Sequence, residues 1–435
     1  MSKVAIIGAG SVVFTQNLVN DMLSTEKLKD TLEIYLMDID KDRLETAYNL
    51  ALRLADHYQA RTKIYKTMDQ KEAVKDAKYV ITTIQVGGLE ATKKDFDIPE
   101  KYGLKQTIGD THGIGGIFRA VRTVPEIVKL AKLMEDLSTD DAVLMNYSNP
   151  MAMVTWSVFE KTDISVVGLC HSIQGTAHQL ASYMGVDYSE LRYRAGGINH
   201  LDWFLELEID GGNAYPLLWE AMQKEDVYKK DKVRFEVMRL FNHFVSESSE
   251  HLSEYLPYFI KEEKKVKELD IPIREYIRRS IDNTQEYEKN KRIASGEEPL
   301  PPLEKSVEYA SSIIYAMETG IHTTIHGNLK NNGLIPNLPE GCCVEVPVLV
   351  NKNGLQPTFF GELPPQLAGI NRMHIGVQDL TLKGIFEKRK DYIYHAALLD
   401  PLANSILKVD QIVNMVDELF DAYNDITVDY KDYRH

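Results

Sequence analysis

Cys170 and His200 are the side chains of this chain best suited to hold a metal ion. Cys170 follows the apolar segment 166–169, and His200 ends the run Gly197–His200. A thiolate and an imidazole bind transition metals well, and two protein ligands leave positions open for water and substrate oxygens. Taken alone, a cysteine at a strand end is more often a packed side chain, and a single histidine is more often a hydrogen-bonded polar group than a metal ligand. The two residues are also too far apart in sequence to form a short metal-binding knuckle. Both lie at or just past the ends of predicted strands, where doubly wound folds bind ligands, so their context favours a metal site.

Gly8 and Gly10 form the turn of a predicted dinucleotide-binding unit. The segment 4–11 reads VAIIGAGS, a short strand that ends in this turn and leads through Ser11 into a helix to about Met22. Glycines there let the backbone approach a pyrophosphate, which then lies at the positive end of the helix. The third glycine of the usual fingerprint is absent, so a purely structural turn is the alternative. The position of the turn between a strand and a helix favours the nucleotide.

Asp38 ends the next predicted strand, Leu32–Met37. An acid at this point hydrogen-bonds the adenosine ribose hydroxyls and favours NAD over NADP, although the nearby Arg43 weakens that preference. Gln85 follows a further apolar strand and is expected to border the nicotinamide side of the cofactor. Asn146 ends another such strand and is expected to bind the cofactor.

Strands and helices alternate over the first part of the chain, which predicts an α/β fold. We expect a doubly wound, Rossmann-like parallel sheet in an NAD-binding domain of residues 1–190, with an intimately packed α+β domain for substrate binding and oligomerisation over residues 191–435. The further elements expected are strands at 64–66, 79–84, 142–146 and 166–170, long helices at 227–250 and 273–292, a hairpin of 344–350 with 355–358, a polar loop at 293–302 and a helical region at 365–424.

Three polar segments are candidates for substrate contacts. The segment 109–116 reads GDTHGIGG and precedes Arg119, which predicts a mobile loop that closes on a polar substrate; a simple surface loop is the alternative. The segment 146–150, NYSNP, carries amides that hold hydroxyl groups or, alternatively, only cap a helix. The segment 247–251, ESSEH, taken alone is typical of a solvated face.

Composition limits the partners that the chain is expected to have. The 435 residues are 44% hydrophobic and 26% charged, as in globular proteins, and the net charge of −15 disfavours nucleic acid and anionic membranes. No apolar stretch is long enough for a membrane span, and a predicted strand follows Met-Ser-Lys without room for a signal peptide. Three cysteines make no disulfide framework, and Cys342 and Cys343 are expected to be buried at the head of a strand. We therefore expect a cytoplasmic protein in which Cys170 stays a free thiol.

These motifs together resemble the family 4 glycoside hydrolases, which are NAD- and Mn²⁺-dependent glycosidases. The resemblance covers nearly the whole chain, and it is greatest to the α-galactosidase (melibiase) branch. It rests on the opening GAGS, Asn149-Pro150, Cys170-His171-Ser172 and Gly197–His200 for the family, and on segments 168–176, 247–251 and 337–346 for the branch. Branches that act on 6-phosphorylated sugars carry Asn or Asp after the metal-binding cysteine. Because this chain carries His171, the resemblance implies an unphosphorylated substrate.

The resemblance also implies roles for individual residues. Cys170 and His200 are the expected ligands of Mn²⁺, although a thiolate and an imidazole by themselves suit Zn²⁺ better. His171 is the expected acid. The base stays open, because Ser249 aligns with Tyr or Asp of other branches; the neighbouring candidates are Glu247, Glu250, His251 and Tyr255. Arg119, Asn149 and Asn199 are the expected sugar-binding residues, with Asp110 orienting Arg119.

The activity implied is hydrolysis of α-galactosides such as melibiose and raffinose. NAD-dependent oxidation at C3 acidifies the C2 proton, elimination releases the aglycone, and water addition and reduction complete the cycle. No residue is assigned to the C4 hydroxyl, so an α-glucosidase or an α-uronidase, galacturonidase or glucuronidase, is the alternative within the family. Two alternatives lie outside the family: an NAD-dependent hydroxy-acid or polyol dehydrogenase, and a non-catalytic NAD-sensing module. The resemblance further implies a homodimer or homotetramer.

Overall fold

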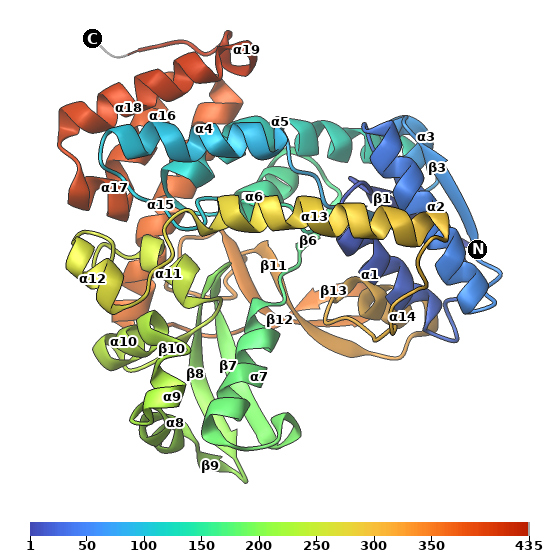
Figure 1. Cartoon of the computed structure of the whole chain (residues 1–435), viewed down its shortest axis with the longest axis horizontal. Coiled ribbons are helices and arrows are strands. Elements are labelled where there is room, and N and C mark those ends of the chain that lie inside the picture. Colours follow the sequence, from blue (N-terminus) through green and yellow to red (C-terminus); the bar gives the residue numbers. More distant parts are fainter. Residues whose placement is uncertain (434–435) are drawn as a thin grey trace.

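One sheet of 13 strands runs through both halves of the chain (Figure 1). The computed structural model describes residues 1–433. The parallel half contains β1 (Ser2–Ile7), β2 (Leu32–Met37), β3 (Lys63–Thr67), β4 (Tyr79–Thr82), β5 (Val143–Asn146) and β6 (Ser165–Gly168). The antiparallel half contains β7 (Leu191–Ile198), β8 (Leu201–Ile209), β9 (Gly212–Asn213), β10 (Phe244–Val245), β11 (Thr323–Lys330), β12 (Cys343–Asn351) and β13 (Gly354–Pro357).

The parallel half has the strand order β3-β2-β1-β4-β5-β6. β4 and β5 are buried along their whole length, which explains their continuous apolar sequences. The strand order reverses between β1 and β4, and doubly wound sheets bind dinucleotides in the crevice at that point. The predicted α/β fold class, with a Rossmann-like first half, is therefore confirmed.

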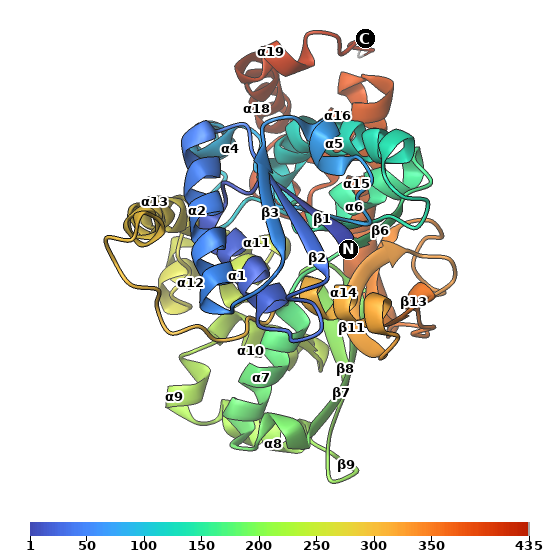
Figure 2. The same ribbon diagram turned by 90° about the vertical axis from the view of Figure 1, so that its right-hand side faces the viewer.

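Helices cover both faces of the parallel half. They are α1 (Val12–Leu23), α2 (Lys41–His57), α3 (Gln70–Val74), α4 (Gly88–Lys101), α5 (Gly113–Leu137) and α6 (Met151–Lys161). The next helix, α7 (Ser172–Met184), follows β6 but packs against β7 and α8 in the second half. Figure 2 shows β1, β2 and β3 between α1 and α2 on one side and α5 and α6 on the other.

The second half differs from expectation in two places. The single helix expected at 227–250 is instead α9 (Glu225–Tyr228), α10 (Lys232–Phe241), β10 and the start of α11 (Ser249–Tyr255). α10 ends because Asn242 adopts a left-handed conformation with φ +62°, and the buried β10 then pairs with β8. The β7–β8 hairpin was not predicted, although it carries His200 in its turn.

The remaining helices include several that pack back onto the first half. They are α8 (Tyr215–Met222), α12 (Glu263–Glu268), α13 (Glu275–Ser295), α14 (Ala310–Thr319), α15 (Pro365–Glu387), α16 (Lys390–Leu399), α17 (Pro401–Ile406), α18 (Val409–Ala422) and α19 (Asn424–Thr427). α15 and α16 contact α5, and α18 contacts α4. The Tyr423 hydroxyl donates to Asp95 Oδ1 at 2.7 Å, and Asp95 also forms a buried ion pair with Arg122. The C-terminal helices thus complete the core of the parallel half.

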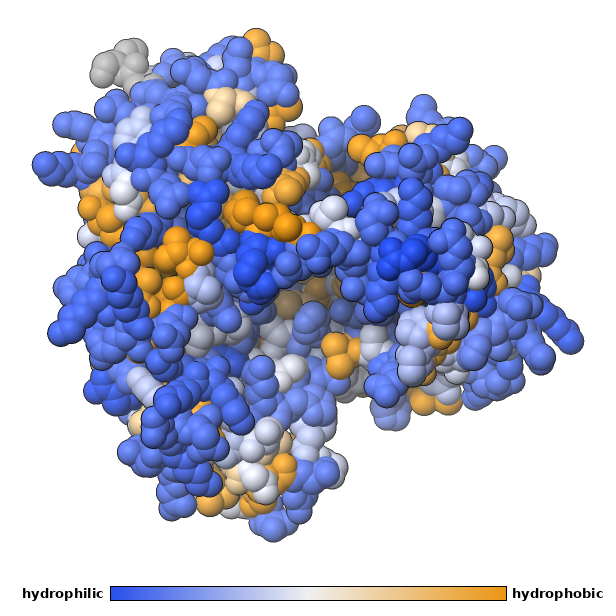
Figure 3. Space-filling model, in the orientation of Figure 1, coloured by the Kyte–Doolittle hydropathy of each residue, from blue (hydrophilic) through white to orange (hydrophobic). Residues whose placement is uncertain are grey.

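The surface is mainly hydrophilic on the face shown in Figure 3, where apolar residues form small groups. Within residues 1–433, no helix combines the length and the apolar character that a membrane span requires.

Candidate active site

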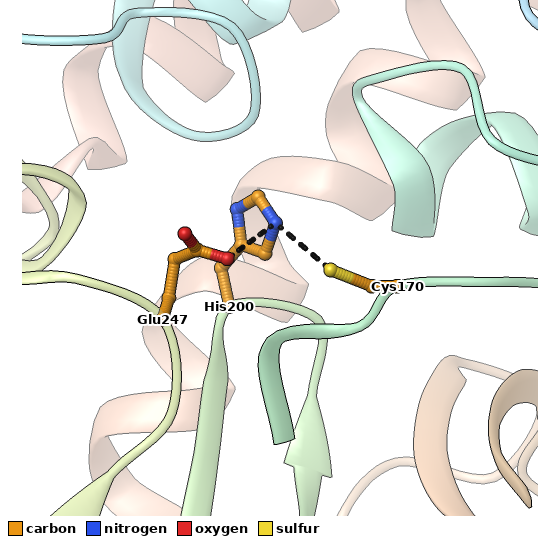
Figure 4. Close-up of side chains that lie close together, drawn as sticks. All are labelled: Cys170, His200 and Glu247. Carbon is orange, nitrogen blue, oxygen red and sulfur yellow. Dashed lines mark hydrogen bonds and ion pairs between the residues drawn. The ribbon is translucent and has the colours of Figure 1, made fainter. Parts of the chain in front are cut away.

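Cys170, His200 and Glu247 converge from three different segments of the chain (Figure 4). Cys170 follows β6, His200 occupies the β7–β8 turn, and Glu247 follows β10. His200 Nε2 lies 3.5 Å from Cys170 Sγ and 3.2 Å from Glu247 Oε2. One ligand atom from each residue lies within 4.8 Å of the others, so the three can share one metal ion. The structure brings the expected pair together and adds Glu247, which the sequence suggested only as a base.

The backbone at two of these residues is strained. His200 has φ +65° and Glu247 has φ +72°, in the left-handed region that residues other than glycine seldom adopt. Such strain costs about 1–2 kcal/mol for each residue and persists where surrounding contacts enforce it. The buried Arg234 side chain donates to the Glu247 carbonyl and holds this conformation. The strain therefore serves to aim both side chains at Cys170.

Tyr255 fixes the orientation of the His200 ring. Its hydroxyl lies 3.1 Å from His200 Nδ1, which leaves Nε2 for the metal side. Tyr255 is buried behind the ring, and burial raises the pKa of its hydroxyl well above the usual value. Glu250 lies away from this cluster, with its carboxylate 3.9 Å from Arg279. The structure thus places neither of these two base candidates at the open side of the cluster.

The donor set fits a divalent cation. Burial raises the pKa of the Cys170 thiol well above its usual value, and the Glu247 charge raises it further. Burial alone would also raise the pKa of Glu247, but the charges of His251, His200, His171 and Arg234 together outweigh it and lower the pKa to about 2. A buried thiol beside an ionised carboxylate becomes a thiolate only when a cation offsets the charge. These residues are therefore matched to a metal that displaces the thiol proton.

Asp110, Arg119 and Asn149 form a connected polar group. Asn149 Nδ2 donates to Asp110 Oδ2 at 2.9 Å, and Arg119 Nε donates to the Asn149 carbonyl at 3.2 Å. Burial alone would raise the pKa of Asp110, but the charges of Arg119, His251 and His200 together outweigh it and lower the pKa. Asp110 is thus an ionised acceptor that holds an amide in place.

The segment that carries Asp110 is buried, in contrast to the mobile loop expected. Glu254 accepts hydrogen bonds from the backbone N–H groups of Thr107 at 2.8 Å and Gly109 at 2.7 Å. Three buried N–H groups on one carboxylate immobilise the turn before α5. No local sequence pattern indicated Glu254, because its partners are distant in the chain.

Several buried polar atoms beside the cluster have no hydrogen-bond partner within the described residues. They are Asn199 Oδ1, Ser148 Oγ and Gln174 Oε1, next to His200, Asn149 and the first turn of α7. A buried polar atom without a partner costs about 1–3 kcal/mol, so each of these atoms is an open hydrogen-bonding position. Asn199 also donates to Glu345 Oε2 at 3.2 Å, which fixes its amide.

Comparison with known proteins places the chain in a family. The model of the family 4 glycosyl hydrolases matches residues 3–186, and the model of their C-terminal domain matches residues 195–403. The chain is a family 4 glycosyl hydrolase. This glycosidase is 42% identical to an α-galactosidase of Bacillus subtilis, over 99% of this chain and 100% of the relative, and 35% identical to an α-galactosidase of Rhizobium meliloti, over 96% and 87%. Its fold matches a 6-phospho-β-glucosidase structure from Thermotoga maritima with manganese, NAD⁺ and glucose-6-phosphate, at a TM-score of 0.79 and 22% identity over 98% and 99% of the chains.

The glycine turn of the glycosidase brings its backbone close to the strand end at Thr83 and Ile84. Gly8 has φ +91°, and a Cβ there would lie 2.9 Å from Ile84 Cγ2. Gly10 N donates to Asp38 Oδ2 at 2.7 Å, and Arg43 Nη1 donates to the Gly10 carbonyl at 2.9 Å. Ser11 makes no side-chain cap, so the first N–H groups of α1 stay open for an anion.

Two other expected cofactor residues are engaged within the protein. Asn146 is fully buried, accepts from Thr82 Oγ1 at 2.9 Å and donates to the Ser148 carbonyl at 3.0 Å. Gln85 Nε2 donates to Thr92 Oγ1 at 3.1 Å. The structure thus shows Asn146 holding the turn after β5 and Gln85 holding the start of α4.

His171 differs from its neighbour Cys170 in its exposure. The His171 side chain is 55% exposed, and its Nδ1 lies 3.3 Å from Glu308 Oε1. The hydrogen bond to Glu308 raises the pKa of His171 against the effect of burial. Sequence reasoning missed Glu308, which lies in a polar segment before α14 without a motif of its own.

His374 gives the glycosidase a predictable sensitivity to acid. Burial lowers the pKa of His374 to about 4, against the hydrogen bond between its Nε2 and the Tyr255 carbonyl at 2.8 Å. Between pH 6.5 and 4 the unfolded chain binds a proton here that the folded chain does not, so stability is full above pH 6.5 and falls towards pH 4. We expect His374→Gln, whose amide keeps the donor, to reduce this loss by about 3 kcal/mol. Urea unfolding of both proteins at several pH values measures it, and equal pH slopes would contradict the prediction.

Proposed function

We propose that this glycosidase is an α-galactosidase that hydrolyses unphosphorylated α-galactosides of the melibiose and raffinose type, with NAD and Mn²⁺ as cofactors. The observation that carries the proposal is the 42% identity to the Bacillus subtilis α-galactosidase over 99% of the chain. The NAD⁺ and manganese in the Thermotoga maritima structure, which has the same fold, support the choice of cofactors.

The charges around the site support an uncharged sugar. The carboxylates of Glu247, Asp110 and Glu308 all lie beside the polar groups that a sugar would meet. Arg119, the cation in this group, already contacts the Asn149 carbonyl and the Tyr276 hydroxyl. A sugar phosphate would bring a double negative charge next to these carboxylates, which disfavours its binding.

Two groups of residues hold the two cofactors in the proposed mechanism. Cys170, His200 and Glu247 hold Mn²⁺, and the turn from Gly8 to Ser11 with Asp38 holds NAD. When bound, the nicotinamide supplies reversible oxidation at C3 of the sugar, and the metal supplies charge stabilisation at its C2 and C3 oxygens.

The proton transfers belong to two histidines. His251 Nδ1 lies 2.9 Å from Ser248 Oγ and 3.3 Å from Glu247 Oε1, which leaves Nε2 to take the C2 proton. Among the base candidates of the sequence, this geometry suits His251 best. His171 donates its proton to the glycosidic oxygen. Asp110, Arg119, Asn149 and Asn199 bind the sugar hydroxyls.

We further infer a cytoplasmic homodimer or homotetramer, with residues 1–190 binding NAD and residues 191–435 binding substrate and forming the interface. The three cysteines of the described chain are free thiols, and a metal ligand such as Cys170 requires a reducing compartment.

The decisive experiment is hydrolysis of 4-nitrophenyl α-galactoside by thiol-reduced protein, with NAD⁺ and Mn²⁺ each present or withheld. We expect cleavage only when both are present, without net accumulation of NADH, because the cofactor is restored in each turnover. Cleavage of the α-glucoside or α-galacturonide analogue in place of the galactoside would contradict the sugar assignment. Accumulation of NADH on a free sugar without any glycoside cleavage would instead establish a dehydrogenase.

A further inference from the structure

The segment 300–309 forms a strap that joins α1 to the active site. Ser306 N donates to Asp21 Oδ1 at 2.8 Å, and the Glu304 carbonyl accepts from Asn20 Nδ2 at 2.9 Å. Beyond the strap, Ala310 N donates to the Tyr147 hydroxyl at 3.1 Å. Contacts at both ends therefore fix the backbone between them, which carries Glu308.

Glu308 is a buried carboxylate aimed at one partner. Its residue is 7% exposed, and Oε1 lies 3.3 Å from His171 Nδ1. Its other oxygen, Oε2, is buried without a hydrogen-bond partner within the described residues. Carboxylates are seldom buried unless a hydrogen bond or an opposite charge offsets the cost, and here His171 provides that interaction.

The contact fixes the direction in which His171 points. The imidazole projects from the N-terminus of α7 and is 55% exposed, so few other contacts restrain its rotation. A carboxylate bound to one ring nitrogen sets the orientation of the ring and of the opposite nitrogen, as in the Ser-His-Asp triad. With Nδ1 held by Glu308, Nε2 is the nitrogen left for the substrate.

We propose that Glu308 is a positioning residue for protonation of the leaving group, and that it acts by orienting His171. The inference rests on the proposed function. As the C1–O bond breaks, its electron pair stays on the glycosidic oxygen, which takes the proton from His171 Nε2 and leaves as an alcohol. The electron pair released by loss of the C2 proton forms the C1–C2 double bond. When water adds to C1, it returns a proton to His171.

The test compares two substrates that differ in their need for an acid. 4-Nitrophenolate leaves without a proton, whereas the alkoxide of melibiose does not. General acid catalysis contributes about 10²–10⁴-fold, so we expect Glu308→Ala to lower kcat on melibiose by about 10²-fold with KM little changed. The same variant should change kcat on 4-nitrophenyl α-galactoside by less than about 3-fold, because that leaving group gains little from an acid. Glu308→Gln keeps an acceptor for Nδ1–H and should recover much of the melibiose activity.

Glu304→Gln is the matched control. Glu304 is an exposed carboxylate on the same strap, and its backbone carbonyl accepts the hydrogen bond from Asn20, so both substrates should react as with the wild type. Imidazole ¹⁵N chemical shifts of His171, measured without substrate, should change in Glu308→Ala and not in this control.

Three outcomes overturn the inference. Equal losses on both substrates in a folded Glu308→Ala variant would show a general structural role. Unchanged kcat on melibiose would show that His171 does not depend on Glu308. A wild-type enzyme inert on both galactosides in the presence of NAD⁺ and Mn²⁺ would reject the proposed function as well, and only this outcome does so.

Discussion

Replacement of Cys170 by Ser should greatly weaken Mn²⁺ binding and lower galactoside hydrolysis by about 10³-fold or more. A hydroxyl in place of the thiol keeps nearly the same shape, but it does not ionise to a soft anionic ligand. His200 and Glu247 alone then hold the ion weakly. Stabilisation by a metal at the C2 and C3 oxygens is worth several kcal/mol, and each 1.36 kcal/mol is about tenfold in rate. Electron paramagnetic resonance of free Mn²⁺ and the steady-state rate measure the two effects.

Cys342→Ser provides the control for this substitution. Cys342 is a fully buried free thiol at the head of β12 and lies outside the metal cluster. We expect this variant to lose some stability and to keep its Mn²⁺ affinity. Wild-type Mn²⁺ affinity in Cys170→Ser would remove Cys170 from the metal site.

Gly8→Ala should lower the free energy of unfolding by about 3 kcal/mol and weaken NAD⁺ binding by about 10²-fold. Two effects add here: the left-handed conformation costs about 1–2 kcal/mol for alanine, and overpacking costs about 1–3 kcal/mol. The new methyl group would lie 2.9 Å from Ile84 Cγ2 and equally close to the Thr83 backbone. Displacement of β4 from β1 moves the N–H groups that face the pyrophosphate, and a shift of about 1 Å can cost about 10²-fold. Urea unfolding and fluorescence titration with NADH test the two parts.

Gly103→Ala separates the effect of strain from the effect of the clash. Gly103 has φ +99°, but a methyl group there would meet no atom within 4 Å. We expect only the backbone cost of about 1–2 kcal/mol and unchanged NADH affinity. Equal losses of NADH affinity in both variants would contradict a direct role for the Gly8 turn.

The parallel half was largely predictable from the sequence because its signals are local. The strand before Gly8, the acid Asp38 after the next strand and the apolar β4 each indicate their element within a few residues. The β7–β8 hairpin was missed, because its turn at Asn199-His200 depends on a left-handed histidine rather than on glycine. The prediction of one helix over 227–250 was wrong for a similar reason. Tertiary packing determines both the end of α10 at Asn242 and the pairing of β10 with β8.

The convergence of Cys170 and His200 could be anticipated from the sequence, whereas the geometry of the other candidate site residues could not. Cys170 and His200 follow strand ends, so their convergence was a reasonable expectation. Glu247, Glu254 and Glu308 act through partners that are far away in sequence, and an isolated glutamate carries no pattern that distinguishes it from a surface residue. The sequence indicated Tyr255 as a base candidate near the site, but only the fold shows that its hydroxyl contacts Nδ1 of the His200 ring.

The return of the C-terminal helices to the first half has a consequence for synthesis of the protein. Phe118 on α5 packs against Phe420 and Tyr423, and Tyr423 lies 328 residues after its partner Asp95. At 5–20 residues per second, a ribosome needs roughly 20–60 s to add that length of chain. During this interval the nascent first half exposes the apolar surface of α4 and α5. We therefore expect it to reach its native state only after translation ends, and to depend on chaperones until then.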